Sequence, residues 1–164
     1  MNGTPFFQKL VNFVLLRIRF FVNDGVSTLQ SHPHFMTKVV VNKGASFTLG
    51  KNSSIQPFTV VNVGKKVEIG DDVMIGTNCL ITDYQHNYLG KGMERRPNAQ
   101  FKDCIIKEGV FIGSNSTIIS SVIGKHCVIG SNSVVVNKEL EDNTFFIGDS
   151  RLTHKSFRRS EIHD

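Results

Sequence analysis

Large aliphatic residues recur at every sixth position over most of the chain. From Val63 the sequence reads VGKKVE, IGDDVM, IGTNCL and ITDYQH, and after a gap it resumes as IKEGVF, IGSNST, IGKHCV, IGSNSV and VVNKEL. The spacing of six is kept within three runs, which are Val63–Ile69–Ile75–Ile81, Ile106–Ile112–Ile118 and Ile123–Ile129–Val135. An amphipathic helix repeats every 3.6 residues or so and a half-buried strand every 2, so neither element alone explains the pattern.

A compact residue precedes most of these aliphatic residues by two positions. The compact residues are Val67, Val73, Cys79, Cys104, Val110, Ser116, Ser121, Cys127 and Ser133. Residues two apart in a strand point to the same side, so both sets face one interior. Short strands joined by corners, three to a coil, stack about 4.8 Å apart through parallel backbone hydrogen bonds. The pattern therefore predicts a β-solenoid, with Leu49 and Ile55 in its first coils. The glycine that follows most of the aliphatic residues suits a corner where a Cβ atom would strain the backbone.

This repeat resembles that of the hexapeptide-repeat acyltransferases over residues 39–155. The resemblance implies an all-β solenoid that is a left-handed parallel β-helix; the period alone does not set the hand of the coil. We expect an N-terminal helix and connector at 1–35, the β-helix acyltransferase domain at 36–155, and a basic tail at 156–164. The tail is expected to be loosely ordered.

The period-six pattern stops between Asp83 and Asp103, where the chain reads DYQHNYLGKGMERRPNAQFKD. An irregular stretch of this length in a compact solenoid is more typical of an extruded functional loop than of a connection. His86 lies at its start. A neutral imidazole accepts the proton that a hydroxyl group loses as it attacks a carbonyl carbon. The sequence therefore favours His86 as a general base, whereas a solvated loop histidine is the alternative.

The segment ITDYQHNY resembles the region around the catalytic histidine of sugar O-acetyltransferases, a group that includes the maltose, galactoside, O-antigen and capsule enzymes. The resemblance implies that His86 is the general base. Asp83 either orients its imidazole, as carboxylates do in triads, or caps the turn, and the sequence leaves both open. Tyr84, Asn87 and Tyr88 are candidate contacts to a sugar ring, with loop packing as the alternative.

The C-terminal segment IGKHCVIGSNSVVVNKELEDNTFFIGDSRL is similar to the closing coils of the same family. The resemblance implies a coenzyme A channel between adjacent subunits, with Ser114 near the thioester and Ser131 beside the pantetheine arm. Asn137, Lys138 and Lys155 match positions near the donor's far end, where cations pair with phosphates. GDSR at 148–151 replaces the family's Gly-Asn-Pro-Ala, and an extra residue leaves the register of Asn137 and Lys138 open by one. Ordinary corner residues and solvated lysines are the alternative.

Residues 5–22, PFFQKLVNFVLLRIRFFV, place apolar side chains at helical spacing. Lys9, Arg17 and Arg19 interrupt the segment, which falls short of the roughly 18 apolar residues of a membrane-spanning helix. An amphipathic helix is therefore expected. It either packs on the base of the β-helix or on a neighbouring subunit, or makes peripheral contact with a membrane surface.

Composition narrows the functional classes. The chain has 19 Lys+Arg against 14 Asp+Glu, a formal charge of +5. Because it has only two tyrosines and no tryptophan, nucleic acid is disfavoured as a partner.

Three cysteines without a CxxC motif favour a reducing compartment and disfavour disulfides or zinc. We expect no metal cofactor, because no histidine pair in the repeat has the spacing of zinc-binding β-helices. A cytoplasmic location follows, peripheral at the inner membrane face if the helix binds lipid.

The sequence thus predicts an enzyme that moves an acetyl group from acetyl-CoA to a sugar hydroxyl, in a surface polysaccharide or its precursor. A homotrimer is implied by the resemblance and not by the period. Two rival enzymatic functions are N-acetylation of an amino sugar nucleotide and O-acetylation of serine. A non-catalytic β-helix scaffold is the rival from another class, because solenoids host many activities.

Overall fold

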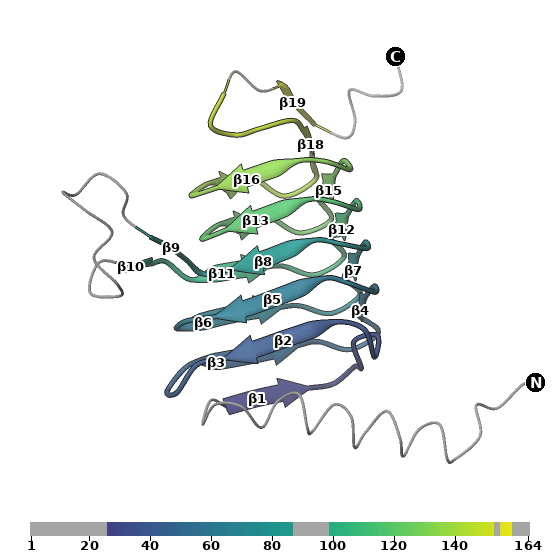
Figure 1. Ribbon diagram of the computed structural model, residues 1–164. Helices are drawn as coiled ribbons and strands as arrows, with labels where there is room; N and C mark the ends of the chain where they lie inside the picture. Colours follow the sequence, from purple (N-terminus) through teal and green to yellow (C-terminus); the bar gives the residue numbers. More distant parts are fainter. Residues whose placement is uncertain (1–25, 87–98, 153–154, 159–164) are drawn as a thin grey trace, which may run out of the picture.

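A computed structural model describes residues 26–86, 99–152 and 155–158. The described chain is a parallel β-helix without α-helices, in which coils stack along one axis and their short strands form three sheets that run along it (Figure 1). From β3 onward each coil visits sheet A, then sheet C, then sheet B. The turns between them are called the A–C, C–B and B–A corners. The predicted all-β parallel solenoid is confirmed.

The sheets are built from strands of two to four residues. Sheet A contains β1 (Val26–Leu29), β3 (Ser46–Leu49), β6 (Lys66–Ile69), β11 (Cys104–Ile106), β14 (Val122–Ile123) and β17 (Glu139–Leu140). Sheet B contains β2 (Lys38–Val41), β5 (Val60–Val63), β8 (Leu80–Thr82), β13 (Thr117–Ile119) and β16 (Val134–Val136). Sheet C contains β4 (Ser54–Ile55), β7 (Met74–Ile75), β12 (Phe111–Ile112), β15 (Val128–Ile129), β18 (Thr144–Ile147) and β19 (Lys155–Arg158).

The period-six residues form the core. Equivalent aliphatic residues of successive coils pair directly, as Ile81, Ile118 and Val135 do along sheet B. In the coil below, the partner of Ile81 is Val61 and not Val63, which the period-six run had suggested. All of these are buried, and so is every aliphatic residue of the three period-six runs. The compact set is buried as well. Its serines bond within the interior, for example Ser121 Oγ, which donates to Ile119 O at 2.7 Å. Each coil therefore buries apolar area against both neighbours, the main stabilising contribution in a solenoid.

The corners differ from the expectation in one respect. At three C–B corners the left-handed backbone conformation falls at an asparagine two residues after the glycine, with φ of 55° at Asn78, 62° at Asn115 and 60° at Asn132. At the A–C corners it also falls on other residue types, such as Asp72 and His126. Asparagine tolerates this region better than most residues. Glycine is needed for space instead: a Cβ at Gly76 would lie 2.6 Å from the Ser114 nitrogen of the next coil. The prediction that a Cβ would strain the backbone at these glycines was therefore wrong about the cause.

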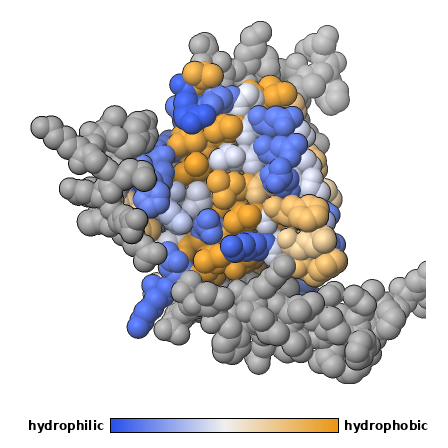
Figure 2. All heavy atoms as spheres, viewed as in Figure 1, coloured by the Kyte–Doolittle hydropathy of each residue, from blue (hydrophilic) through white to orange (hydrophobic). Residues whose placement is uncertain are grey.

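The outward residues of sheet B are largely apolar. Val60, Leu80 and Val134 are half-buried and lie in one column with Lys38 and Thr117, through the pairs of β2, β5, β8, β13 and β16. Figure 2 views this side of the molecule and shows hydrophobic residues along the stack, interspersed with hydrophilic ones. The face of sheet B is therefore less polar than a typical solvated surface.

Two of the expected features, the helix and the tail, belong to the ends of the chain. The expected helix at 5–22 lies outside the described residues. At the other end β19 pairs antiparallel with β18 and crosses the boundary expected at residue 155. The expectation of a loosely ordered tail was wrong for 156–158, because pairing with β18 fixes these residues at the sheet edge. Within the described ranges, no helix has the length and apolar character needed to cross a membrane.

Candidate active site

A two-stranded arm leaves the β-helix at the B–A corner, directly after β8. Its strands β9 (Tyr84–His86) and β10 (Ala99–Phe101) are antiparallel, with His86 opposite Ala99 and Tyr84 opposite Phe101. Figure 1 shows the arm projecting sideways from the stack. The extruded loop is thus confirmed, although its base is a regular strand pair and not irregular chain. Asn87 and Tyr88 lie outside the described residues.

Aromatic rings seat the arm on the β-helix. The ring of Tyr84 lies 5.7 Å from that of Phe101 and 6.0 Å from the imidazole of His86, centroid to centroid. Both phenyl rings cover Gly64, where a Cβ would lie 2.3 Å from Phe101 Cε1 and 2.9 Å from Tyr84 Cδ1. His86 itself is exposed. The packing therefore holds one exposed imidazole at the root of the arm.

The carboxylate of Asp83 is fully buried and bonds to backbone. Its Oδ1 accepts the N–H of Gly64 at 2.7 Å, and its Oδ2 accepts the N–H groups of Lys65 at 2.6 Å and Lys66 at 2.5 Å. This is the turn-capping alternative of the sequence analysis. Three donors occupy both oxygens, which stabilises a buried carboxylate. Asp83 therefore fixes the corner from which the arm starts.

The other end of the arm is tied to the same corner. Lys65 Nζ forms an ion pair with Asp103 Oδ1 at 3.0 Å, and the N–H of Lys102 donates to the Asp83 carbonyl at 2.9 Å. Lys102 and Asp103 come directly after β10, just as Asp83 comes directly before β9. The arm is thus held at both of its ends, and the β-helix sets its direction.

Ser114 and Ser131 lie on a different corner, the C–B corner. Ser114 Oγ accepts the hydroxyl of Thr77 one coil below at 3.2 Å. Beside this pair, the Asn78 carboxamide donates to Asn115 Oδ1 at 3.0 Å. Ser131 is exposed one coil above, where its nitrogen lies close to Gly113. Hydroxyl and carboxamide groups therefore form a polar ladder along this corner, suited to an extended ligand with amide groups.

The remaining predicted residues divide between two places. Asn137 and Lys138 lie on the B–A corner, two coils beyond Asp83, since Asn137 N–H donates to Ile119 O and Ser120 N–H to Thr82 O. Lys138 is half-buried, and its N–H donates to Ser121 Oγ. Lys155 lies in β19, where its backbone pairs with Ile147 of β18; only its backbone is described. Within one chain, the predicted donor residues therefore do not share a corner.

The distance between the two corners is set by sheet B. Five residues separate Asn115 from Ser120, which spans roughly 16 Å at the rise of a strand. The arm that carries His86 extends away from the β-helix (Figure 1). His86 and Ser114 of the same chain are therefore too far apart to act on one small group.

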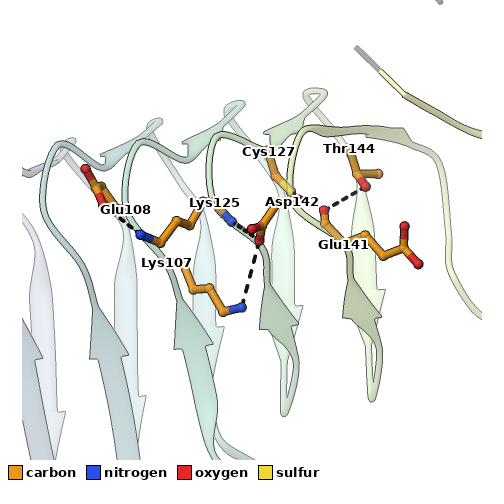
Figure 3. A network of polar contacts seen from close by, with 7 residues as sticks. All are labelled: Lys107, Glu108, Lys125, Cys127, Glu141, Asp142 and Thr144. Atoms are coloured by element: carbon orange, nitrogen blue, oxygen red, sulfur yellow. Dashed lines mark hydrogen bonds and ion pairs between the residues drawn. The ribbon is translucent and has the colours of Figure 1, made fainter. Parts of the chain in front are cut away.

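The third corner, A–C, carries charged side chains with a structural role (Figure 3). Lys125 bridges neighbouring coils, with Nζ 3.2 Å from Glu108 Oε2 and its N–H donating to Asp142 Oδ1 at 2.8 Å. Exposed ion pairs of this kind stabilise by about 1 kcal/mol or less. The Cys127 thiol donates to Glu141 O at 3.0 Å, and burial raises its pKa. A protonated, bonded thiol is a poor nucleophile, so this corner does not present a reactive group.

Sequence reasoning missed several residues that build the site. Gly64 and Lys65 belong to the VGKKVE hexad and Phe101 to the interruption, but their role in holding the arm depends on contacts across coils that the repeat does not encode. Asn78 and Asn115 carried a signal, since IGTN and IGSN repeat an asparagine at the same corner position. Among the described residues, no group of three or more His, Cys, Asp or Glu side chains is arranged to hold a metal ion.

Comparison with known families identifies the repeat. The bacterial transferase hexapeptide family (six repeats) matches residues 103–137, and the hexapeptide repeat of succinyl-transferase matches residues 66–82. The hexapeptide repeat predicted from the sequence is thus confirmed over these residues. No curated protein matches the chain by sequence.

Three solved structures show how widely the fold is shared. A hexapeptide-repeat acetyltransferase from Vibrio cholerae, VCA0836, complexed with acetyl coenzyme A, aligns with a TM-score of 0.67 at 19% identity over 96% of this chain and 91% of that one. AntD, an N-acyltransferase from Bacillus cereus in complex with dTDP and 3-hydroxybutyryl-CoA, aligns at 0.61 and 18% identity over 96% and 90%. The polySia-specific acetyltransferase NeuO aligns at 0.65 and 20% identity over 82% and 57%. These likenesses confirm the fold.

Proposed function

We propose that this protein is an acetyl-CoA-dependent O-acetyltransferase that acts on a sugar hydroxyl in surface polysaccharide or its precursor. The observation that carries the proposal is His86, an exposed imidazole clamped at the root of the arm on a hexapeptide-repeat β-helix. A general base must reach a substrate proton while its own position is fixed. The Tyr84 ring and the backbone bonds of Asp83 supply that fixation.

The reaction is a direct transfer. The acceptor hydroxyl attacks the thioester carbonyl carbon as its proton passes to His86, and a tetrahedral intermediate forms with its charge on the former carbonyl oxygen. The C–S bond then breaks, the thiolate of coenzyme A leaves, and the imidazolium returns the proton to that sulfur. The backbone N–H of Ser114 is assigned to the oxyanion, since the neighbouring N–H groups of Gly113 and Asn115 already donate to Ile129 O and Thr77 O. Ser131, Asn137, Lys138 and Lys155 are assigned to the donor's pantetheine arm and phosphates.

A second copy of the chain completes the site in this proposal. His86 lies beyond the B–A corner, whereas Ser114 lies on the C–B corner. These two corners are roughly 16 Å apart along sheet B. A cyclic trimer brings the arm of one subunit to the C–B corner of the next, and repeats this contact three times. The apolar outer face of sheet B supports such contact (Figure 2). The homotrimer is therefore part of the proposed mechanism.

N-acylation of an amino sugar nucleotide is the second candidate. AntD, which shares the fold, was solved with dTDP-4-amino-4,6-dideoxyglucose and coenzyme A. An amine with a free lone pair needs less help from a base than a hydroxyl does. The dependence of the rate on His86 therefore separates the two reactions.

A thiol-release assay tests the proposal. Acetyl-CoA is supplied with methyl pyranosides, amino sugar nucleotides or serine, and wild type is compared with His86→Ala. We expect turnover with a pyranoside and a loss of about 10²- to 10⁴-fold in His86→Ala. The matched control is His126→Asn, because His126 is exposed at a corner with φ of 55°, which asparagine tolerates. Equal rates for wild type and His86→Ala would remove His86 from the mechanism, and no turnover with any acceptor would favour a scaffold.

A further inference from the structure

Phe58 occupies a corner position that the following coils give to asparagine. Its φ is 63°, and the equivalent residues Asn78, Asn115 and Asn132 have φ of 55°, 62° and 60°. A bulky side chain in the left-handed region is uncommon and strained. Burial does not compensate, because Phe58 is 61% exposed. A residue that breaks both a backbone preference and the rule for apolar burial is a candidate for function.

Two further exposed apolar residues lie at the same corner one coil below Phe58. Its N–H donates to the carbonyl of Met36, one coil below, at 3.3 Å, and Met36 is 40% exposed. The neighbouring Phe35 is 47% exposed and its ring lies 4.4 Å from that of His34. The lower part of the C–B corner is therefore an apolar platform of Phe35, Met36 and Phe58, whereas its upper part is the polar ladder of Thr77, Asn78, Ser114 and Asn115.

The platform continues the proposed donor path. Backbone hydrogen bonds stack Pro57 below Asn78, Thr77 below Asn115, and Ser114 below Asn132. Phe58 thus lies two coils, or about 10 Å, below the level of Ser114. A donor that runs from Ser131 to a thioester at Ser114 points along this corner toward Phe58. The acetyl methyl group extends only about 1.5 Å beyond the carbonyl carbon, so it leaves the gap for the acceptor.

We propose that Phe58, with Met36, is the stacking platform for the pyranose ring of the acceptor; this inference rests on the proposed function. One face of a pyranose carries C–H groups, which pack on an aromatic ring, while its hydroxyl groups need polar partners. The carboxamide of Asn78 lies directly above the platform and can donate and accept. The corner thus favours an acceptor ring with an apolar face and a polar edge. An acyclic acceptor gains no binding affinity from stacking on Phe58.

The variant Phe58→Asn tests this inference with little risk to the fold. It installs the residue that the next three coils carry at this position, so we expect an unchanged or higher melting temperature. The KM for methyl pyranosides should rise about tenfold or more, while the KM for acetyl-CoA and the rate with serine stay within twofold. Phe58→Tyr retains the ring and should retain the pyranoside KM. Phe111→Thr, which removes an exposed ring from β12, is the matched control.

The outcomes separate the platform from the reaction. Unchanged pyranoside KM in Phe58→Asn overturns the inference and leaves the acetyltransferase proposal standing. A change of oligomeric state in Phe58→Asn, measured by light scattering, overturns it in favour of a subunit contact, and a selective loss with butyryl-CoA overturns it in favour of an acyl pocket. If wild type turns over no acceptor, ligand-observed NMR with methyl pyranosides decides: binding to wild type but not to Phe58→Asn supports the platform without the reaction.

Discussion

The imidazole of His86 lies edge-on to the ring of Tyr84, with centroids 6.0 Å apart and planes at 84°. Edge-to-face packing is a preferred arrangement of aromatic rings. Tyr84 in turn packs with Phe101 over Gly64. The position of the imidazole relative to the β-helix is therefore set by aromatic packing. Asp83 contributes from a distance, by fixing the backbone turn beneath the arm. Within the described residues, the orientation of His86 thus rests on ring packing and not on the carboxylate of Asp83.

Replacing Asp83 by alanine should destabilise the corner and the arm together. The change leaves the partly buried N–H groups of Gly64, Lys65 and Lys66 without their acceptor, which we expect to cost on the order of 3 kcal/mol in unfolding free energy. Urea unfolding measures this. The exposed Asp142, which accepts one N–H from Lys125, is the matched control, and Asp142→Ala should cost about 1 kcal/mol or less.

The pH profile distinguishes this role from a triad. Asp83→Asn should lower kcat while the pH midpoint of kcat/KM stays where it is in wild type, because the carboxylate does not bond the imidazole. A clear shift of that midpoint would show that Asp83 and His86 are electrostatically coupled, and would restore the orienting role.

Two glycines of the C–B corner should respond differently to alanine. A Cβ at Gly113 would lie 2.5 Å from the backbone nitrogen of Ser131, whereas a Cβ at Gly130 meets only the Ile147 side chain, at 3.2 Å or more. Backbone cannot move aside without disturbing coil stacking, while an exposed side chain can rotate. We expect Gly113→Ala to lose about 2 kcal/mol or more and Gly130→Ala less than about 1 kcal/mol. Thermal unfolding of the pair checks this, and equal losses would contradict it.

The Cys104 thiol should make the fold sensitive to alkali. Burial raises the pKa of Cys104 from 9.0 to about 12. Above pH 9 the unfolded chain ionises this thiol while the folded chain keeps it protonated, so stability falls as pH rises from 9 toward 12. At pH 10.5 the loss is roughly 2 kcal/mol relative to neutral pH. Urea unfolding of wild type and Cys104→Ala at both pH values isolates the effect, and identical pH dependence in the two proteins would refute it.

The period of the sequence was enough to predict the core. Ile69, Ile75 and Ile81 are one coil's three inward aliphatic residues, and spacing alone placed them on three sheets. Stacked coils make burial a local property, because each coil repeats the environment of the next. For the same reason the interruption after Ile81 identified the arm and His86.

Contacts between coils that occur only once could not be predicted from the sequence pattern. The pairing of Tyr84 with Phe101 joins both ends of the arm, and nothing in the local pattern sets that register. The choice between the two roles of Asp83 depended on the turn one coil below, eighteen residues earlier at Lys65. Phe58 gave no signal either, since its unusual position becomes visible only when the corners are superposed.

Subunit mixing tests the central claim most directly. Chains with His86→Ala lack the base, and chains with Ser131→Trp have the exposed C–B corner blocked, so each protein alone should be inactive. If one site joins the arm of one subunit to the C–B corner of the next, random co-refolding at equal ratio should restore about one quarter of wild-type thiol release. A mixture that stays as inactive as its two components would contradict a site shared between copies of the chain.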